Sequence, residues 1–179
     1  MDWHAVIEFW FDECEPQDHW RKSPEFDRLI AMRFGDAHQQ ACRCELWRWR
    51  ERAQGRLAEI VVLDQFSRNI YRDQPQAFAQ DALALALAQE AVAVGADLEL
   101  RPEQRAFLYM PYMHSESLAI HLQAERLFSQ PGLESNHRFE QRHQQIIERF
   151  GRYPHRNAIL GRRSTPEEER FLQQPGSSF

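Results

Sequence analysis

The sequence is poor in glycine, cysteine and lysine. Its 179 residues include seven glycines and three cysteines, and Lys22 is the only lysine. Scarce glycine beside abundant Ala, Leu, Gln, Glu and Arg favours helices. Three thiols cannot all pair within one chain, which suits a reducing compartment, and Cys42 and Cys44 have no second cysteine pair to complete a zinc site. The sequence therefore excludes a fully disulfide-bonded framework.

Long apolar runs are also missing. None approaches the roughly 18 residues that a membrane-spanning helix needs. The first residues lack the basic region and apolar run of a signal peptide. We therefore expect a cytoplasmic protein without membrane association.

Positive charge is in deficit, because the formal net charge is −5. Such a balance gives no diffuse attraction to nucleic acid, and no nucleic-acid partner is expected, although a local basic patch can still bind an anion. The basic residues are almost all arginine. This reflects either a compositional bias or the use of two-pronged contacts that arginine makes with anions.

Hydrophobic spacing predicts helices along the chain. The clearest is the Ala/Leu-rich stretch at 75–95. Residues 57–63, LAEIVVL, have the composition of a strand, but no partner strand is apparent, so we predict a buried helix. Pro111 is expected to break or kink its helix. The prediction is one all-α domain of seven to eight helices without a sheet over residues 1–173, followed by a flexible tail at 174–179.

A basic segment, residues 149–165, lies between two predicted helices. It carries the following basic and histidine side chains: Arg149, Arg152, His155, Arg156, Arg162 and Arg163. In a net acidic protein such a segment either binds an anion or neutralises acidic helix faces packed against it. If a short helix begins at Pro154, its free N–H groups add to the arginine charges as an anion site.

Several stretches, taken together, resemble one bacterial family, a domain of unknown function with a tetratricopeptide-repeat-like helical fold. They are IEFWF at 7–11, VLDQFSRNIYR at 62–72, AFAQD at 77–81, FLYMPYMHSES at 107–117 and RFGRYPHRNAILGRRSTPEE at 149–168. They occur in the family's order and span nearly the whole chain. The resemblance implies stacked helical hairpins and implies no activity.

Three positions depart from the family's pattern. Ser67 stands where the family usually has proline, which softens the turn but leaves Asp64, Arg68 and Asn69 in place. Tyr153 stands for a usual phenylalanine. His121 stands for a more usual glutamine.

Polar residues at 64–72 form the first candidate site. Asp64, Arg68 and Arg72 are spaced four apart and share a helix face, with Asn69 beside them. They form either part of a binding site or a structural ion pair that ties a loop to a helix end.

The sequence His114-Ser115-Glu116 forms a second candidate. A His-x-Glu pair also occurs in zinc deaminases, but their Pro-Cys-x-x-Cys partner is absent. On a continuing helix His114 and His121 would share a face with Glu125, an arrangement typical of metal ligands. A required ligand is not expected at an idiosyncratic position such as His121, so we favour a helix-capping role for Ser115 or Glu116 and predict no metal and no cofactor.

The leading interpretation is a binding module with a polar cleft for an anionic small molecule or an acidic protein or peptide segment. The predicted ligand-binding residues are Asp64, Arg68, Asn69, Arg72, Arg152, His155, Arg156 and Asn157. The alternative is a hydrolase or lyase that uses Glu116 as base and His114, His143 or His155 as acid. A third interpretation is purely structural, with every arginine paired internally.

Overall fold

The computed structural model describes residues 2–179, and these residues form helices and loops without a strand. The α-helices are α1 (Trp3–Glu8), α2 (Pro24–Cys42), α3 (Ala53–Val61), α4 (Ser67–Ile70), α5 (Asp81–Ala93), α6 (Pro102–Met113), α7 (Leu118–Phe128), α8 (Glu134–Phe150) and α9 (Pro166–Leu172). A π-helical turn, Val62–Phe66, joins α3 to α4 without a break, so the two act as one helix. The predicted all-α fold is confirmed.

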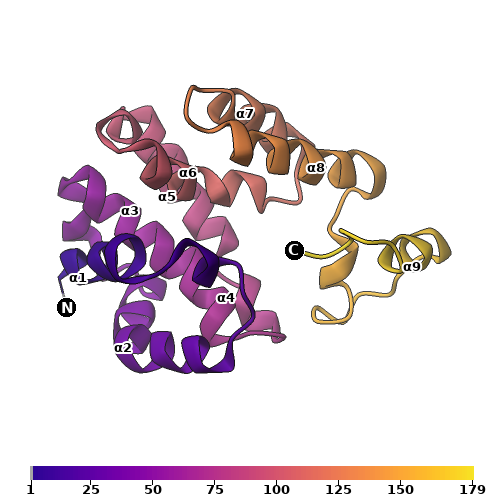
Figure 1. Ribbon diagram of the computed structural model, residues 1–179, viewed down its shortest axis with the longest axis horizontal. Coiled ribbons are helices and arrows are strands. Elements are labelled where there is room, and N and C mark those ends of the chain that lie inside the picture. Colours follow the sequence, from indigo (N-terminus) through magenta and orange to yellow (C-terminus); the bar gives the residue numbers. More distant parts are fainter. Residues whose placement is uncertain (1) are drawn as a thin grey trace.

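From α5 to α8, helices that follow one another in the sequence pack side by side (Figure 1). Contacts link α5 to α6, α6 to α7 and α7 to α8, while α3 also contacts α1, α5 and α6. This succession is consistent with the stacked hairpins expected of a tetratricopeptide-like fold. The short helix α9 lies beyond the basic segment, apart from the main stack (Figure 1).

The α3–α4 run supplies the centre of the core. Leu57, Ile60, Leu63 and Phe66 are completely buried, together with the residues between them that face other helices. A helix that is apolar on all sides has to be enclosed by others. This explains why LAEIVVL, which has the composition of a strand, forms a helix: α1, α2, α5 and α6 cover it instead of neighbouring strands.

Helix α6 passes through Pro111 and ends only at Met113. The break expected at Pro111 therefore falls two residues later. Proline has no backbone N–H, so one hydrogen bond of the helix is missing, and its ring crowds the preceding turn. The helix ends two residues after Pro111. The chain then turns at residues 114–117 before α7, and this turn carries His114 and Glu116.

Gly55 should not tolerate a larger side chain. A β-carbon there would lie 2.0 Å from the backbone oxygen of Trp49, which cannot move without the short 3-10 helix that carries it. We expect Gly55→Ala to lower the free energy of unfolding by about 1–3 kcal/mol, as overpacking does. Gly35, also inside a helix but with nothing within 4 Å of such an atom, is the control. Gly35→Ala should leave stability unchanged or raise it by up to about 1 kcal/mol in the same urea titration.

The end of α8 and the chain after it form a second, smaller apolar cluster around Ile146, Ile147 and Tyr153. Thr165 caps α9 and Glu168 reaches back to it, so the two residues form a capping box. The last residues return towards the middle of the molecule (Figure 1), where the ring of Phe179 packs on that of His143 with centroids 3.8 Å apart. The expected flexibility of residues 174–179 stays a prediction.

Across residues 2–179, no helix combines the length and apolarity needed to cross a membrane.

Candidate anion-binding site

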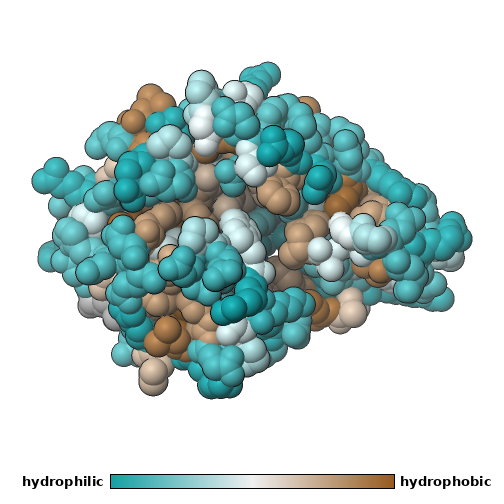
Figure 2. Space-filling view, in the orientation of Figure 1, coloured by the Kyte–Doolittle hydropathy of each residue, from teal (hydrophilic) through white to brown (hydrophobic). Residues whose placement is uncertain are grey.

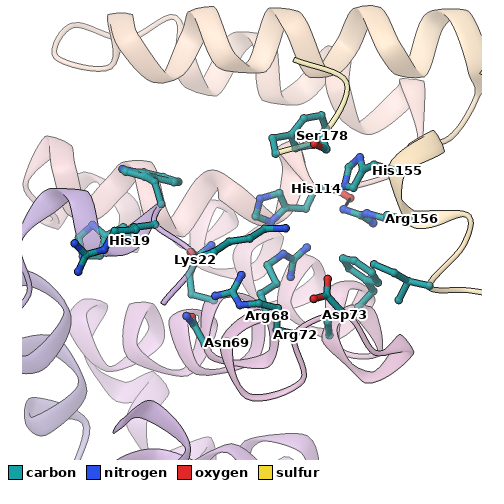
Figure 3. Close-up of a pocket in the computed structure, with 17 residues that line it drawn as sticks. His19, Lys22, Arg68, Asn69, Arg72, Asp73, His114, His155, Arg156 and Ser178 are labelled. Carbon is teal, nitrogen blue, oxygen red and sulfur yellow. Dashed lines mark hydrogen bonds between the residues drawn. The ribbon is translucent and has the colours of Figure 1, made fainter. Parts of the chain in front are cut away.

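Three segments that are far apart in the sequence meet at one place. Asp64 and Arg68 come from the α3–α4 run, His114 from the turn after α6, and Arg156 from the 3-10 helix Pro154–Arg156. The His114 imidazole lies 2.7 Å from the Asp64 carboxylate, and Arg156 donates to the backbone oxygen of His114 at 3.0 Å. The convergence of these segments is the central feature of the site (Figure 3).

Local helical structure places Asp64 and Arg68. Asp64 lies in the π-helical turn Val62–Phe66, a kind of turn that is frequent at functional sites. Arg68 is four residues later and lies 3.1 Å from the Asp64 carboxylate, as the sequence spacing predicts. Gln65 donates to the other carboxylate oxygen at 2.6 Å. Asp64 is only 1% exposed, so its charge depends on these partners.

The Asp64–His114 pair has a defined protonation state. Burial alone would raise the pKa of Asp64, but the charge of Arg68 and the imidazole of His114 outweigh burial and hold that pKa well below its usual range. Burial lowers the pKa of His114, more than the Asp64 carboxylate raises it. At neutral pH the site therefore contains a carboxylate and a neutral imidazole.

Asp81 links Arg68 and Arg156. Arg68 forms a two-bond contact with its carboxylate at 2.9 and 3.0 Å, and Arg156 donates to it at 3.2 Å. Both guanidinium groups also lie over the ring of Phe78, at 5.5 and 4.6 Å from its centroid. Sequence reasoning did not assign Asp81 to the site, although it ends the AFAQD stretch at 77–81 that contributes to the family resemblance.

Arg156 is buried and incompletely paired. It is 5% exposed, and its Nε atom has no acceptor among the described residues. Burial, followed by repulsion from Arg68, lowers the pKa of the group from its usual value. A buried donor without a partner is uncommon in proteins and carries a free-energy cost. Arg156 thus has one donor that no residue of the described chain satisfies.

A cavity of about 490 Å³, here called the cationic cavity, opens beside this group. Its lining includes five cationic side chains, Arg21, Lys22, Arg68, Arg72 and Arg156, whereas among residues 2–179 Asp73 is the only acidic side chain in the lining. Trp20, Phe78 and Phe179 supply aromatic walls. Figure 2 shows a hollow in the middle of this face, between the bulk of the helices and the part that carries α9, with hydrophilic residues around it. The cavity presents positive charge, although the whole protein is acidic.

The acids that balance this charge lie behind the cavity wall. Arg72 forms a two-bond contact with Asp27 at 2.5 and 2.7 Å, and Asn69 donates to the same carboxylate at 2.8 Å. Lys22 is different, because it forms no hydrogen bond or ion pair within residues 2–179. In Figure 3 its side chain extends towards Arg68 and His114. Sequence reasoning missed Lys22, whose only distinction there is to be the single lysine.

Two histidines near the cavity are neutral. Burial, assisted by the positive charges of Arg156 and Arg68, lowers the pKa of His155 to about 3. Burial also lowers the pKa of His143 to about 3, although a hydrogen bond to the backbone oxygen of Phe139 opposes the shift. His155 lines the cavity, and its Nδ1 atom is buried without a partner among residues 2–179. His143 packs behind Phe179 and lines neither of the cavities described here.

Other predicted site residues are engaged within the protein. Arg152 forms a two-bond contact with Glu168 at 2.7 and 2.8 Å, and Asn157 accepts from Arg162 at 3.0 Å. Neither lines the cationic cavity. Within the basic segment, Arg156 ends the 3-10 helix Pro154–Arg156 and lines the cavity, whereas Arg152 lies before that helix and pairs with Glu168 of α9.

Neither Ser115 nor Glu116 caps α7, contrary to expectation, because the N-cap position is Ser117, whose side chain forms no cap hydrogen bond. Glu116 instead accepts the backbone N–H of Tyr153 at 2.7 Å and both prongs of Arg162 at 2.6 and 2.8 Å. The acid therefore ties the basic segment to the turn after α6. The expectation fails because a partner 46 residues away competes for the carboxylate more strongly than the helix end.

A second cavity of about 380 Å³ shares Phe78, His114 and Arg156 with the first and is also lined by Asp81 and Glu116. The four candidate catalytic residues are distributed unequally, and His155 lines only the first cavity. His114 lines both cavities, Glu116 lines only the second, and His143 lines neither. His114 and Glu116 therefore meet at the second cavity, whereas His143 lies away from both.

The structure also locates the residues considered as metal ligands. Within the described part of the chain, no three His, Cys, Asp or Glu side chains are grouped as ligands. His121 is completely buried and contacts Glu140 at 2.6 Å, the backbone oxygen of Ser115 at 2.8 Å and the hydroxyl of Tyr153 at 3.1 Å. Its role is to hold α7, α8 and the basic segment together.

Comparison with known proteins gives a family and a structural relative. The profile of the family "Bacterial protein of unknown function (DUF924)" matches residues 6–176. The solved structure of a protein of unknown function, ATU0120, from Agrobacterium tumefaciens is similar with a TM-score of 0.87 and 37% sequence identity, over 96% of each chain. No curated protein matches significantly. The family match covers Asp64, Arg68, Asp81, His114 and Arg156.

Proposed function

We propose that this chain, which belongs to the DUF924 family of bacterial proteins of unknown function, binds a small anionic molecule in the cationic cavity. The observation that carries the proposal is the buried Nε of Arg156, a donor without an acceptor in the wall of a cavity that presents five cationic side chains. A carboxylate or phosphate oxygen is the partner that such a guanidinium binds best.

The size of the cavity favours a small molecule over a peptide. Its volume of about 490 Å³ lies within the range of roughly 300–1,000 Å³ that small-molecule sites occupy. Aromatic walls beside a few convergent polar groups are also typical of such sites. An acidic peptide is the second class of ligand considered. We also propose a cytoplasmic location, because the ligand is expected among soluble metabolites.

The test is calorimetric titration of the purified chain with inorganic phosphate, citrate, a mononucleotide and an acidic peptide at one ionic strength. Saturable binding of at least one small anion is expected. Lys22→Met should weaken it about tenfold, the contribution of a charge-assisted hydrogen bond of roughly 1.5 kcal/mol. Lys22 is the suitable position because it has no partner within residues 2–179, so its removal leaves no other charge unpaired.

Arg28→Met is the matched control. Arg28 lies on α2, does not line the cavity and pairs only with the exposed Glu25 at 3.5 Å. The Arg28→Met substitution removes the same unit of charge as Lys22→Met, so any general electrostatic effect on anion affinity is equal in the two variants. Equal affinities of the two variants, or saturable binding by the peptide alone, would contradict the proposed site.

A further inference from the structure

His114 presents one of its ring nitrogens to the cationic cavity. The Nδ1 atom of His114 lies 2.7 Å from an oxygen of Asp64. The other ring nitrogen, Nε2, has no hydrogen-bond partner among residues 2–179 and is not one of their buried, unpaired atoms, so solvent reaches it. The side chain is 14% exposed and lines the cavity between Lys22 and Arg156 (Figure 3).

The partner of Nδ1 fixes the tautomer of the imidazole. The Asp64 carboxylate also accepts from Gln65 at 2.6 Å and lies 3.1 Å from Arg68, contacts that stabilise its charged form. An ionised carboxylate can only accept hydrogen bonds, so the proton must be on Nδ1. In a neutral imidazole the remaining nitrogen, Nε2, then carries a lone pair and can only accept.

We infer that the ligand of the cationic cavity is an anion that carries its own hydroxyl donor beside the charge, and that His114 selects it by accepting that donor. The inference rests on the proposed function and narrows the class of ligand. An oxygen without a proton would bring its lone pairs against those of Nε2 and leave the acceptor unpaired. Two kinds of small anion satisfy the requirement, a hydrogen phosphate or phosphate monoester with a P–OH group and a hydroxycarboxylate.

Two matched pairs of probes separate the hydroxyl from the charge. Hydrogen phosphate and sulfate are both tetrahedral and are both divalent at about pH 8, but only the phosphate carries a proton. Malate and succinate are both four-carbon dicarboxylates, and only malate carries a hydroxyl. A site built to hydrogen-bond a hydroxyl rejects an analogue without it strongly, because the polar group of the protein is left unpaired. We expect at least a tenfold preference for the hydroxylated member of one pair.

The experiment measures the four affinities by calorimetry at one ionic strength, with the wild-type chain and with His114→Phe. In the variant the preference should disappear, while thermal unfolding checks that the chain still folds. If the variant does not fold, the wild-type ratios alone decide. A preference within the phosphate pair identifies a phosphate ligand, and one within the malate pair identifies a hydroxy acid.

The outcomes distinguish the two proposals. Binding of all four anions with equal affinity would leave the cationic cavity as an anion site and overturn the role of His114. Tighter binding of sulfate than phosphate and of succinate than malate would overturn it equally. Binding of none of the four, together with no binding of the nucleotide or citrate, would overturn the proposed function and this inference together.

Discussion

Replacing Arg68 with methionine should lower the free energy of unfolding by about 3–5 kcal/mol, the usual cost of removing one member of a buried ion pair. Arg68 contacts both Asp64 and Asp81. Asp64 is 1% exposed, and without the arginine its charge has only His114 and Gln65 as partners. Urea titration followed by circular dichroism gives the change in stability, provided that the slope of the transition is unaltered.

Arg43→Met is the control for this prediction. Arg43 forms a contact of the same two-bond geometry with Glu45, at 2.8 and 3.0 Å, but the two side chains are 56% and 49% exposed. Exposed pairs contribute only about 0–1 kcal/mol. If Arg68→Met costs no more than Arg43→Met, then Asp64 and Asp81 do not depend on Arg68, and the proposed organisation of the site is wrong.

Acidification from pH 7 to pH 5 should destabilise the protein, with His143 and His155 each contributing about 2 kcal/mol. Burial lowers the pKa of each imidazole from an unfolded value near 6.5 to about 3. Below about pH 6.5 the unfolded chain binds a proton at each position, whereas the folded chain does not until about pH 3. The stabilising contribution of the two neutral histidines is therefore fully present above about pH 6.5, and it decreases as the pH falls from about 6.5 towards 3.

The variant His143→Gln isolates one of these contributions. It removes one titrating group, so its loss of stability between pH 7 and pH 5 should be about 2 kcal/mol smaller than that of the wild type. Urea titrations at a series of pH values measure both curves. Parallel curves for the variant and the wild type would show that His143 titrates alike in the folded and unfolded chains, contrary to its buried position.

Local sequence patterns were sufficient for the helices and for part of the site. LAEIVVL was correctly predicted as a buried helix because no second strand was available to pair with it. The fourfold spacing of Asp64 and Arg68 correctly placed both on one helix face. The family stretches also pointed to the segments of His114 and Arg156, which meet although 42 residues separate them.

The ion-pair partners were beyond the reach of sequence reasoning. Arg68 and Arg156 share Asp81, which lies 13 residues from the first and 75 from the second, and no periodicity encodes such distances. The same holds for Asp27, which binds Arg72 from α2. Arg152 and Arg156 looked equivalent in the sequence, but the turn at Pro154 directs them to different partners.

Most of the predicted site arginines have partners within the protein, and the binding interpretation stays a proposal. Arg68, Arg72 and Arg152 each have a carboxylate partner at close distance, as the structural interpretation expects. Arg156 has one such partner and also an unpaired Nε in the wall of the cationic cavity. The internal pairs thus connect the cavity wall to the rest of the fold, and in our proposal Arg156 and Lys22 are the donors that contact the ligand.

The Nε–H resonance of Arg156 in a proton–nitrogen spectrum tests the anion site most directly. Arg156→Lys assigns the peak by its disappearance, and phosphate or the best anion from calorimetry is then titrated at constant ionic strength. A ligand oxygen that accepts the buried donor should shift this peak saturably, with the calorimetric dissociation constant, while the peak of the distant Arg43 stays in place. An unmoved Arg156 peak at saturating anion, or equal shifts of both peaks, would contradict binding in the cationic cavity.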